Sequence, residues 1–357
     1  MKITKISFKR LHLVPVVNFK IASSDEQRSE TIIVKVETDE GIVGYGESQP
    51  SRVVTGNSIE EVECFLADMD DFLRGENPLA IGHIHDRMNR FIKGKSSGKA
   101  GIDLALYDIL GKKMGAPVYQ LIGGASNQIA SDITIGIDEP QKMAALAQKY
   151  VAEGYRILKI KIGIDPVDDV EAIRLIREAV GPEISLRVDA NQGYHAKQAV
   201  QIARAFETYH VDEIEQPVPW HDLEGLKKVT QHAQQLIMAD ESVLSPQDAS
   251  RVVKMEACDV INIKLMKSGG LYPALQINAI AQAAGLECMV GCMTESRIGI
   301  AAGAALAVSQ KNISYADLDS YLLMEEVPGI TGGFTQSGGI VTVPDAPGLG
   351  LHVDLQF

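Results

Sequence analysis

Five charged residues recur at a nearly constant spacing in the middle of the chain. Lys161, Asp189, Glu215, Asp240 and Lys264 are separated by 28, 26, 25 and 24 residues, and each lies in or closes a short apolar run. One strand plus one helix spans a segment of this length, so the spacing predicts one charged group at the carboxyl end of each successive strand. In a (β/α)₈ barrel that end carries the active site. We therefore expect three carboxylates, flanked in sequence by two lysines, at a barrel mouth.

The three carboxylates are candidate ligands for a metal ion. Asp189, Glu215 and Asp240 offer only oxygen, and no His or Cys closes a strand among them. Hard oxygen ligands favour Mg²⁺, whereas zinc is usually held by His or Cys. The alternative interpretation is that each acid caps the helix that follows it, which explains one acid better than three in consecutive units. The pattern favours a Mg²⁺ site.

The lysines are candidate bases. Lys159 and Lys161 are two residues apart on one predicted strand, so both point into the barrel, and Lys264 approaches from across it. Buried ammonium groups need facing anions, which the three carboxylates supply. We expect repulsion between Lys159 and Lys161 to lower the pKa of one of them toward the range of a general base. The alternative is a salt-bridge network that only fills the barrel centre, although branched apolar residues normally do this.

These groups together fit the removal of a proton next to a carboxylate. The resulting enediolate carries two negative charges, which Mg²⁺ stabilises and to which Lys159 adds a second cation. One of the two outer lysines, Lys161 or Lys264, takes the proton and the other returns one to the opposite face, which inverts the carbon. A leaving group β to the carboxylate would lead to elimination instead, and the spacing leaves both outcomes open.

The patterns around these residues predict an α/β chain of two parts. Eight strand-like runs, most of them separated by helical patterns, predict a barrel; they occur at 129–137, 156–163, 184–190, 211–216, 236–241, 259–265, 286–292 and 313–319. The preceding residues show strands and then helices, typical of a small α+β domain, at about 3–13, 31–38, 42–47, 58–74, 79–92 and 98–114. We expect a capping domain over 1–125, a catalytic barrel over 126–321, and a segment over 322–357 that packs back on the capping domain.

Composition narrows the class of partner. The net charge is −13 and there is no basic run, which argues against nucleic acid as the main partner. Four cysteines without a CxxC pattern indicate reduced thiols and a cytoplasmic location. The first 15 residues alternate apolar and charged positions, as a strand does and a signal peptide does not. No apolar run approaches the roughly 18–20 residues that a membrane helix needs.

A family resemblance rests on the residues around the strand ends. The relevant motifs are Lys159-Ile-Lys161, Asp189-Ala-Asn191, Glu215-Gln-Pro217, Asp240-Glu241-Ser242 and Asn262-Ile-Lys264-Leu-Met-Lys267-Ser-Gly-Gly270. Together they resemble the enolase superfamily, muconate-lactonizing subgroup, over essentially the whole chain. The mandelate-racemase subgroup uses a His after the seventh strand, where this chain has Gly291-Cys292-Met293. The resemblance implies a homo-oligomer, catalysis by Lys161 and Lys264, and support of the metal ligands by Asn191 and Glu241.

A second acidic pair narrows the choice within the subgroup. Asp317 and Asp319 end the eighth predicted strand on one face and form a receptor for a substrate cation, the alternative being a helix cap or a solvated turn. The chain most resembles the dipeptide epimerases, in which such a pair holds the free α-ammonium of a dipeptide. The resemblance implies that the dipeptide carboxylate binds Mg²⁺, that the C-terminal residue is inverted, and that Thr134, Lys159 and Thr294 line the pocket. The alternatives are o-succinylbenzoate synthase, N-acylamino acid racemase and muconate-type cycloisomerase, whose substrates lack this ammonium.

One departure from the family concerns specificity. Epimerases acting on Ala-Glu tend to carry an Arg in the first cover loop, where this chain has Ser24; Phe19 belongs to the same possible specificity loop. Without an Arg, a buried side-chain carboxylate of the substrate would be poorly paired. We therefore expect Ala-Glu to be a poor substrate and the second residue to be apolar, polar-neutral or basic. A barrel that binds a ligand without chemistry is disfavoured because all five charged residues are present.

Overall fold

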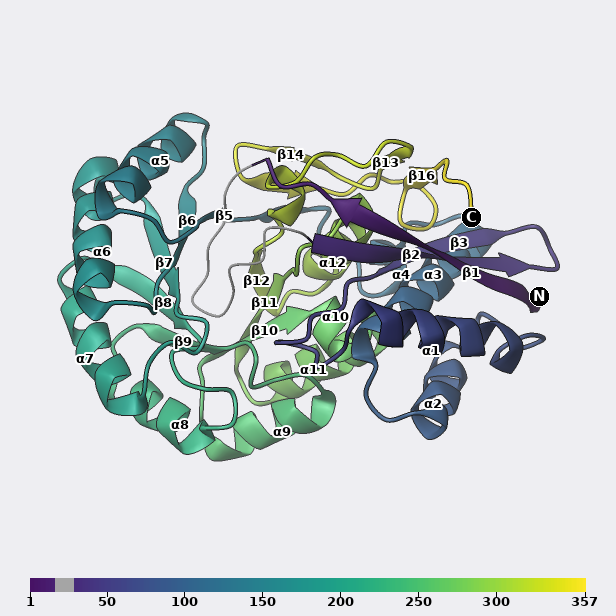
Figure 1. Cartoon of the computed structure of the whole chain (residues 1–357), viewed down its shortest axis with the longest axis horizontal. Coiled ribbons are helices and arrows are strands. Elements are labelled where there is room, and N and C mark those ends of the chain that lie inside the picture. Colours follow the sequence, from purple (N-terminus) through teal and green to yellow (C-terminus); the bar gives the residue numbers. More distant parts are fainter. Residues whose placement is uncertain (17–28) are drawn as a thin grey trace.

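The structure is a computed structural model, and it describes residues 1–16 and 29–357. The two residues of the predicted specificity loop, Phe19 and Ser24, lie outside the described residues. Figure 1 shows a barrel of strands surrounded by helices, with a smaller unit of strands and helices beside it. Within the described ranges, no helix has both the length and the apolar character that crossing a bilayer requires.

The smaller unit is an antiparallel sheet covered by helices. Its strands, in spatial order, are β1 (Ile3–Leu13), β2 (Ser29–Thr38) and β3 (Val43–Ser48). Its helices are α1 (Ile59–Phe72), α2 (Ile81–Phe91), α3 (Ser96–Met114) and α4 (Val118–Leu121). Glycines at 44 and 46 let α3 lie directly on β3, since a Cβ at either position would overlap the α3 backbone. The predicted order of strands followed by helices is confirmed.

The larger unit is an eight-stranded parallel sheet whose spatial neighbours are also neighbours in sequence. Its strands are β5 (Ile133–Ile135), β6 (Ile157–Lys161), β7 (Ser185–Asp189), β8 (Val211–Glu215), β9 (Leu236–Ala239), β10 (Val260–Lys264), β11 (Glu287–Gly291) and β12 (Ile313–Ala316). The helices between and after them are α5 (Pro140–Ala152), α6 (Pro166–Val180), α7 (Ala196–Glu207), α8 (Leu223–His232), α9 (Pro246–Met255), α10 (Leu265–Ser268), α11 (Leu271–Ala283), α12 (Arg297–Ser309) and the 3₁₀ turn η1 (Ser320–Leu322). This is the predicted (β/α)₈-type architecture.

The first barrel strand is shorter than predicted. The run over 129–137 contains two strands, β4 (Gln128–Ala130) and β5, and β4 pairs antiparallel with a C-terminal strand instead of joining the barrel. The barrel ends meet at a single bridge between Ser131 and Ala316, beside a 3.0 Å hydrogen bond from the Asp132 N–H to the Ala316 oxygen. The predicted strand was too long because its first part, β4, pairs with residues that lie about two hundred positions later in the chain.

The C-terminal segment contacts both units. It contains β13 (Ile330–Gly332), β14 (Thr335–Ser337), β15 (Ile340–Thr342) and β16 (Leu351–Val353). β15 pairs with β4 beside the barrel, while Ile330 packs with Ile33 of β2 and Ile298 of α12. Its Leu349 N–H also donates to Asp108 of α3 at 2.9 Å. The boundaries proposed at residues 125 and 321 stay predictions.

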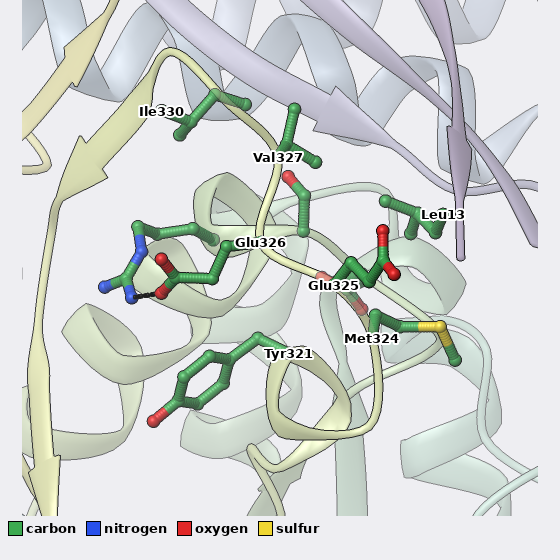
Figure 2. A pocket seen from close by; sticks show the side chains of 10 residues that line it. Leu13, Tyr321, Met324, Glu325, Glu326, Val327 and Ile330 are labelled. Carbon is green, nitrogen blue, oxygen red and sulfur yellow. Dashed lines mark hydrogen bonds and ion pairs between the residues drawn. The ribbon is translucent and has the colours of Figure 1, made fainter. Parts of the chain in front are cut away.

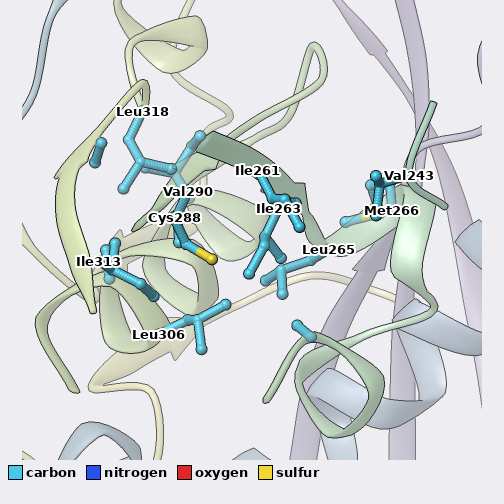
Figure 3. Packing of buried hydrophobic residues seen from close by; sticks show 14 of the residues in the cluster. Val243, Ile261, Ile263, Leu265, Met266, Cys288, Val290, Leu306, Ile313 and Leu318 are labelled. Atoms are coloured by element: carbon cyan, nitrogen blue, oxygen red, sulfur yellow. The ribbon is translucent and has the colours of Figure 1, made fainter. Parts of the chain in front are cut away.

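Packing outside the barrel sets the direction of the side chains within it. Figure 3 shows Ile261 and Ile263 of β10 and Val290 of β11 together with Leu306 of α12 in one buried apolar cluster. Side chains alternate between the two faces of a strand. The apolar contacts of Ile261 and Ile263 with the helix layer therefore direct Lys264 to the barrel interior.

Candidate active site

The strand ends bring the five spaced residues to one rim of the barrel. Lys161, Asp189 and Glu215 are direct partners in the ladders that join β6, β7 and β8. Asp240 follows the last residue of β9, and Lys264 ends β10. All five side chains are buried. The structure thus brings together the residues that the spacing predicted, at the carboxyl ends of five consecutive strands.

The three acids of this rim do not cap the following helices. The N-cap residues of α6, α7, α8 and α9 are Asp165, His195, Asp222 and Ser245, each several residues beyond its strand end. Asp165, Asp222 and Ser245 accept hydrogen bonds from backbone N–H groups of their helices. The helix-cap interpretation of the strand-end acids is therefore wrong.

Two lysines of β6 bind the acids from one side. The Lys159 Nζ lies 3.2 Å from Asp189 Oδ2, 2.7 Å from Glu215 Oε2 and 2.7 Å from Asp317 Oδ2. The Lys161 Nζ donates to Asp189 Oδ2 at 2.6 Å and to Asn191 Oδ1 at 3.1 Å. Lys159 lies deeper because it comes two residues before Lys161 on β6, and its third carboxylate, Asp317, follows β12, which closes the barrel beside β5.

Two further lysines bind Asp240 from the opposite side. The Lys264 Nζ lies 2.8 Å from Asp240 Oδ2, and the Lys267 Nζ lies 2.5 Å from Asp240 Oδ1. Lys267 also donates to the Asn262 oxygen at 3.1 Å and is only 1% exposed. Sequence reasoning assigned Lys267 no role. Its position three residues after Lys264 could have indicated this contact, because one turn of α10 returns the chain to the end of β10.

The lysine pKa values differ from the expectation. Burial alone would lower the pKa of Lys159, but Asp317 and other carboxylates outweigh it and raise that pKa well above its ordinary value. Burial would also lower the pKa of Lys264, but the charges of Asp240, Glu215 and Asp189 together outweigh it and raise that pKa. We expected repulsion to lower the pKa of one of the two lysines of β6; Lys159 is not that lysine, because attraction to the carboxylates dominates its pKa.

The carboxylate pKa values show an uneven charge balance. Burial would raise the pKa of Asp189, yet Lys161 and Lys159 bring it down to about 2. Burial and the charge of Asp189 instead raise the pKa of Glu215. Burial and nearby acids raise the pKa of Glu241 to about 7. The cluster therefore carries more acid than its lysines neutralise.

The predicted cation receptor lies beside this cluster. Asp317 and Asp319 follow β12, and both are buried. Asp317 contacts Lys159, while Asp319 Oδ2 accepts the backbone N–H of Thr134 at 2.6 Å. Burial and the neighbouring Asp317 charge raise the pKa of Asp319 to about 6. Thr134 lies on β5 directly opposite Lys159, so two of the predicted pocket residues adjoin the pair.

The loop after β11 completes this side of the mouth. Thr294 is half-buried in that loop, between β11 and α12. The thiol of Cys292, in the same loop, and oxygens of Asp317 and Asp319 lie within 4.8 Å of one another. Burial, reinforced by Asp317, raises the pKa of the Cys292 thiol well above its ordinary value, which keeps it a poor metal ligand.

The donor set around Asp189, Glu215 and Asp240 fits a hard divalent cation. Its ligand atoms are carboxylate oxygens on three adjacent strands. Asp189 and Asp240 are turned toward lysines. The oxygens of the three acids therefore do not lie within 4.8 Å of one another, as the ligand atoms of Cys292, Asp317 and Asp319 do. Glu241 Oε2 is buried there without a hydrogen-bond partner. A bound cation would balance the excess negative charge of these acids and give the buried Glu241 oxygen a partner.

Amide side chains orient the ligand set. Asn191 Nδ2 donates to Glu241 Oε1 at 3.4 Å, and the Asn191 backbone N–H donates to Asp189 Oδ1 at 2.9 Å. Asn262 Nδ2 donates to Glu215 Oε1 at 2.8 Å. The contacts of Asn191 and Glu241 agree with the expected support of the metal ligands. Asn262 is a third residue that contacts a ligand candidate; it belongs to the quoted motif, but we had predicted no role for it.

Deeper in the barrel lies a polar layer that sequence reasoning missed. Arg187 of β7 covers the ring of Tyr315 of β12 at 3.3 Å, and the Tyr315 hydroxyl binds Glu213 of β8. Arg187 and Glu213 sit two residues before Asp189 and Glu215, so the alternation of strand side chains was the available signal. Arg187 pairs directly with Lys159 in the β6–β7 ladder, so this layer is level with Lys159 and lies two residues below the rim.

Comparison with known proteins agrees with this geometry. Residues 5–123 match the family model for the mandelate racemase / muconate lactonizing enzyme N-terminal domain, and residues 142–357 match the model for the enolase C-terminal domain-like family. The two matches correspond to the sheet-and-helix unit and to the barrel with its C-terminal segment.

Individual relatives span the whole chain. The hydrophobic dipeptide epimerase of Enterococcus faecalis is 44% identical over 98% of this chain and 99% of its own. The L-Ala-D/L-Glu epimerase of Bacillus subtilis is 39% identical over 98% and 97%. The crystal structure of the dipeptide epimerase of Enterococcus faecalis V583 with Mg and L-Leu-L-Tyr superposes with a TM-score of 0.96 at 43% identity, over 99% of this chain and 100% of that one. The chain belongs to the mandelate racemase/muconate lactonizing enzyme family of the enolase superfamily.

Proposed function

We propose that the protein is an isomerase, a Mg²⁺-dependent epimerase of dipeptides that inverts the α-carbon of the C-terminal residue. The observation that carries the proposal is the placement of Lys161 and Lys264 on opposite sides of three buried strand-end carboxylates. A substrate carboxylate bound to an ion at those acids would have its α-carbon between the two lysine side chains. Dipeptide epimerases among the relatives support the substrate class.

Asp189, Glu215 and Asp240 would hold the Mg²⁺ ion, supported by Asn191 and Glu241. When bound, the ion supplies positive charge that stabilises the enediolate formed from the substrate carboxylate. The unpaired Glu241 oxygen and the raised pKa of Glu215 support this assignment.

The lysines move the proton. The lysine that is neutral, Lys161 or Lys264, would take the α-proton, and the other, protonated, would return one to the opposite face of the carbon. Lys159 lies between Asp189, Glu215 and Asp317, where its ammonium adds a second positive charge. The raised pKa of Lys159 suits a residue that stays charged throughout.

Asp317 and Asp319 would receive the dipeptide α-ammonium, with Thr134, Lys159 and Thr294 lining the pocket. Both acids are buried, but only Asp317 contacts Lys159 directly, so a substrate ammonium group would stabilise the remaining buried negative charge. For the second residue of the dipeptide we retain apolar, polar-neutral or basic side chains, with Ala-Glu a poor substrate. The name of the hydrophobic dipeptide epimerase relative supports this range.

One observation favours a second candidate, racemisation of an N-acylated amino acid. The Lys159–Asp317 contact already gives Asp317 a cation, so the acidic pair has a structural explanation that needs no substrate ammonium. The same two-lysine chemistry would then invert the α-carbon of an amino acid whose nitrogen is an uncharged amide.

We further propose that the chain acts as a cytoplasmic homo-oligomer. The family resemblance supports the assembly, and four free cysteines, of which Cys258 and Cys288 are buried, support a reducing compartment.

A library of L,L-dipeptides in D₂O with Mg²⁺ tests the proposal by mass spectrometry. We expect a gain of one mass unit in particular dipeptides, which establishes α-proton abstraction and identifies the side chains. No gain in any dipeptide, with exchange in N-acylamino acids, would overturn the dipeptide assignment in favour of the second candidate.

A further inference from the structure

A buried carboxylate of the smaller unit holds the start of a barrel helix. Glu47, on β3, is fully buried. Its Oε1 accepts the Ser296 backbone N–H at 2.8 Å and the Thr31 hydroxyl at 2.7 Å. Its Oε2 accepts the Ser296 hydroxyl at 2.6 Å and the Gly299 N–H at 2.8 Å. The first N–H groups of α12, which have no partner within the helix, are thus bound by a residue some 250 positions earlier in the chain.

The residues next to this cap reach the proposed cation receptor. The Glu295 backbone N–H donates to the Ser320 hydroxyl at 3.2 Å, and that hydroxyl lies 3.2 Å from the Glu295 oxygen. Ser320 directly follows Asp319. On the other side of the loop, the Met293 N–H donates to Glu295 Oε1 at 2.8 Å. A continuous series of contacts therefore runs from Glu47 through Ser296 and Glu295 to Asp319.

A small pocket lies on the other side of this loop. Figure 2 shows Leu13, Tyr321 and Met324 among the side chains that line it, and Glu295, Ser296 and Arg297 at the start of α12 also border it. Its volume is only about 10 Å³, room for about one water molecule, so this side of the loop leaves little free space. Beside this pocket, the hydrogen bonds to Glu47 hold Ser296, and the contact with Ser320 holds the neighbouring Glu295.

We propose that Glu47 is a positioning residue for the substrate-ammonium receptor. By fixing the start of α12 it fixes the β11–α12 loop, and through Ser320 it fixes the direction in which Asp319 faces the mouth. The smaller unit thereby influences dipeptide affinity through a residue that touches no substrate. This inference rests on the proposed function for its kinetic consequences, although the contacts themselves do not.

The geometry defines an isosteric test, Glu47→Gln. A glutamine amide has one acceptor oxygen, so in either orientation its NH₂ faces a backbone N–H, that of Ser296 or of Gly299, and leaves this donor unpaired. The Ser320→Ala variant breaks the same series of contacts at its far end without touching the contact between the two units.

The chain offers a matched control in Asp103. This buried α3 carboxylate caps another barrel helix, α11, by accepting the Leu271 N–H at 2.5 Å and the Tyr272 N–H at 3.3 Å. Asp103→Asn makes the same chemical change at the other junction between the units, away from residues 292–296 and 319–320. The change in KM of Asp103→Asn therefore shows how much a weakened contact between the two units affects binding when residues 292–296 and 319–320 are left unchanged.

The experiment measures KM, kcat and hydrogen exchange of the Mg²⁺-loaded protein for the three variants. We expect Glu47→Gln to raise the dipeptide KM about tenfold with kcat changed by less than about threefold, and Ser320→Ala to raise KM by a smaller factor. Amide exchange over 292–299 and 319–321 should accelerate in Glu47→Gln but not in Asp103→Asn.

Two results would overturn the inference: an unchanged KM in a folded Glu47→Gln protein, or an equal KM rise in Asp103→Asn. If the unmodified protein turns over no dipeptide, the proposed function fails instead. Hydrogen exchange then still decides whether Glu47 positions the receptor loop, and unaltered exchange over 319–321 would refute it.

Discussion

The acids after β7, β8 and β9 and the acids after β12 share one barrel mouth but differ in their partners. In the first group, Asp189 and Asp240 contact two lysines each. In the second, Asp317 contacts Lys159, whereas Asp319 is hydrogen-bonded by Thr134 and forms no ion pair with any residue that the structure describes. The consequence appears in the pKa values, lowered to about 2 at Asp189 and raised to about 6 at Asp319.

This difference shows how one pocket can hold two cations of different kinds. The strand-end acids are oxygen ligands on three adjacent strands with residual acid nearby, which suits a divalent ion. The β12 pair offers a single buried carboxylate short of positive charge, which suits one ammonium group. The following predictions break or sharpen the contrast, beginning with the largest effect.

The largest effect should come from the lysines that flank the first group. Lys161→Ala and Lys264→Ala should each lower kcat at least about a thousandfold, because each removes one of two proton-transferring groups. Turnover is followed by polarimetry, and deuterium incorporation from D₂O shows which half of the proton transfer survives. Lys254→Ala, an exposed lysine of α9, serves as the control. Near-normal turnover in either variant would refute the two-base scheme.

Removal of the metal ion should show which of the two acidic groups binds it. Chelation should reduce turnover more than about a hundredfold, and added Mg²⁺ should restore it. Mg²⁺ should also raise the thermal midpoint of unfolding, since a ligand that binds the folded state stabilises it. Asp189→Asn should abolish this rise and Asp319→Asn should retain it. A loss of the Mg²⁺ effect in Asp319→Asn would place the ion at the β12 pair instead.

Substitution in the second group should affect binding more than chemistry. Asp319→Asn should raise the dipeptide KM by about tenfold to a hundredfold, the magnitude of a lost charged hydrogen bond, with a smaller change in kcat. The matched comparison is the N-acetylated form of the same dipeptide, which has no ammonium to lose. If both substrates suffer equally, Asp319 has a structural role.

The smallest effect concerns pH. Asp319 binds an ammonium only when ionised, and burial together with Asp317 raises its pKa to about 6. The dipeptide KM should therefore fall as pH rises through about 6, by about tenfold between pH 5 and 7. In Asp317→Asn the like charge is gone, so this midpoint should move to lower pH. A KM that is flat from pH 5 to 7 would contradict the assignment.

Much of the site followed from the spacing of a few residues. Parallel strands place their carboxyl ends at one edge, so a charged residue every 24 to 28 positions must arrive at the same rim whatever packs around it. The alternation of strand side chains likewise decided that Lys159 and Lys161 point the same way. These are local consequences of backbone geometry, and the structure brings the residues together accordingly.

The contacts that set charge state and position were decided by tertiary structure alone. The raised pKa of Lys159 depends on Asp317, 158 residues away, and the cap on α12 depends on Glu47, about 250 residues away. The pairing of β4 with β15 in place of the barrel is equally remote. Sequence patterns report which face a side chain occupies, because that repeats every few residues. The partner a side chain meets there depends on how distant segments pack, and no local pattern records it.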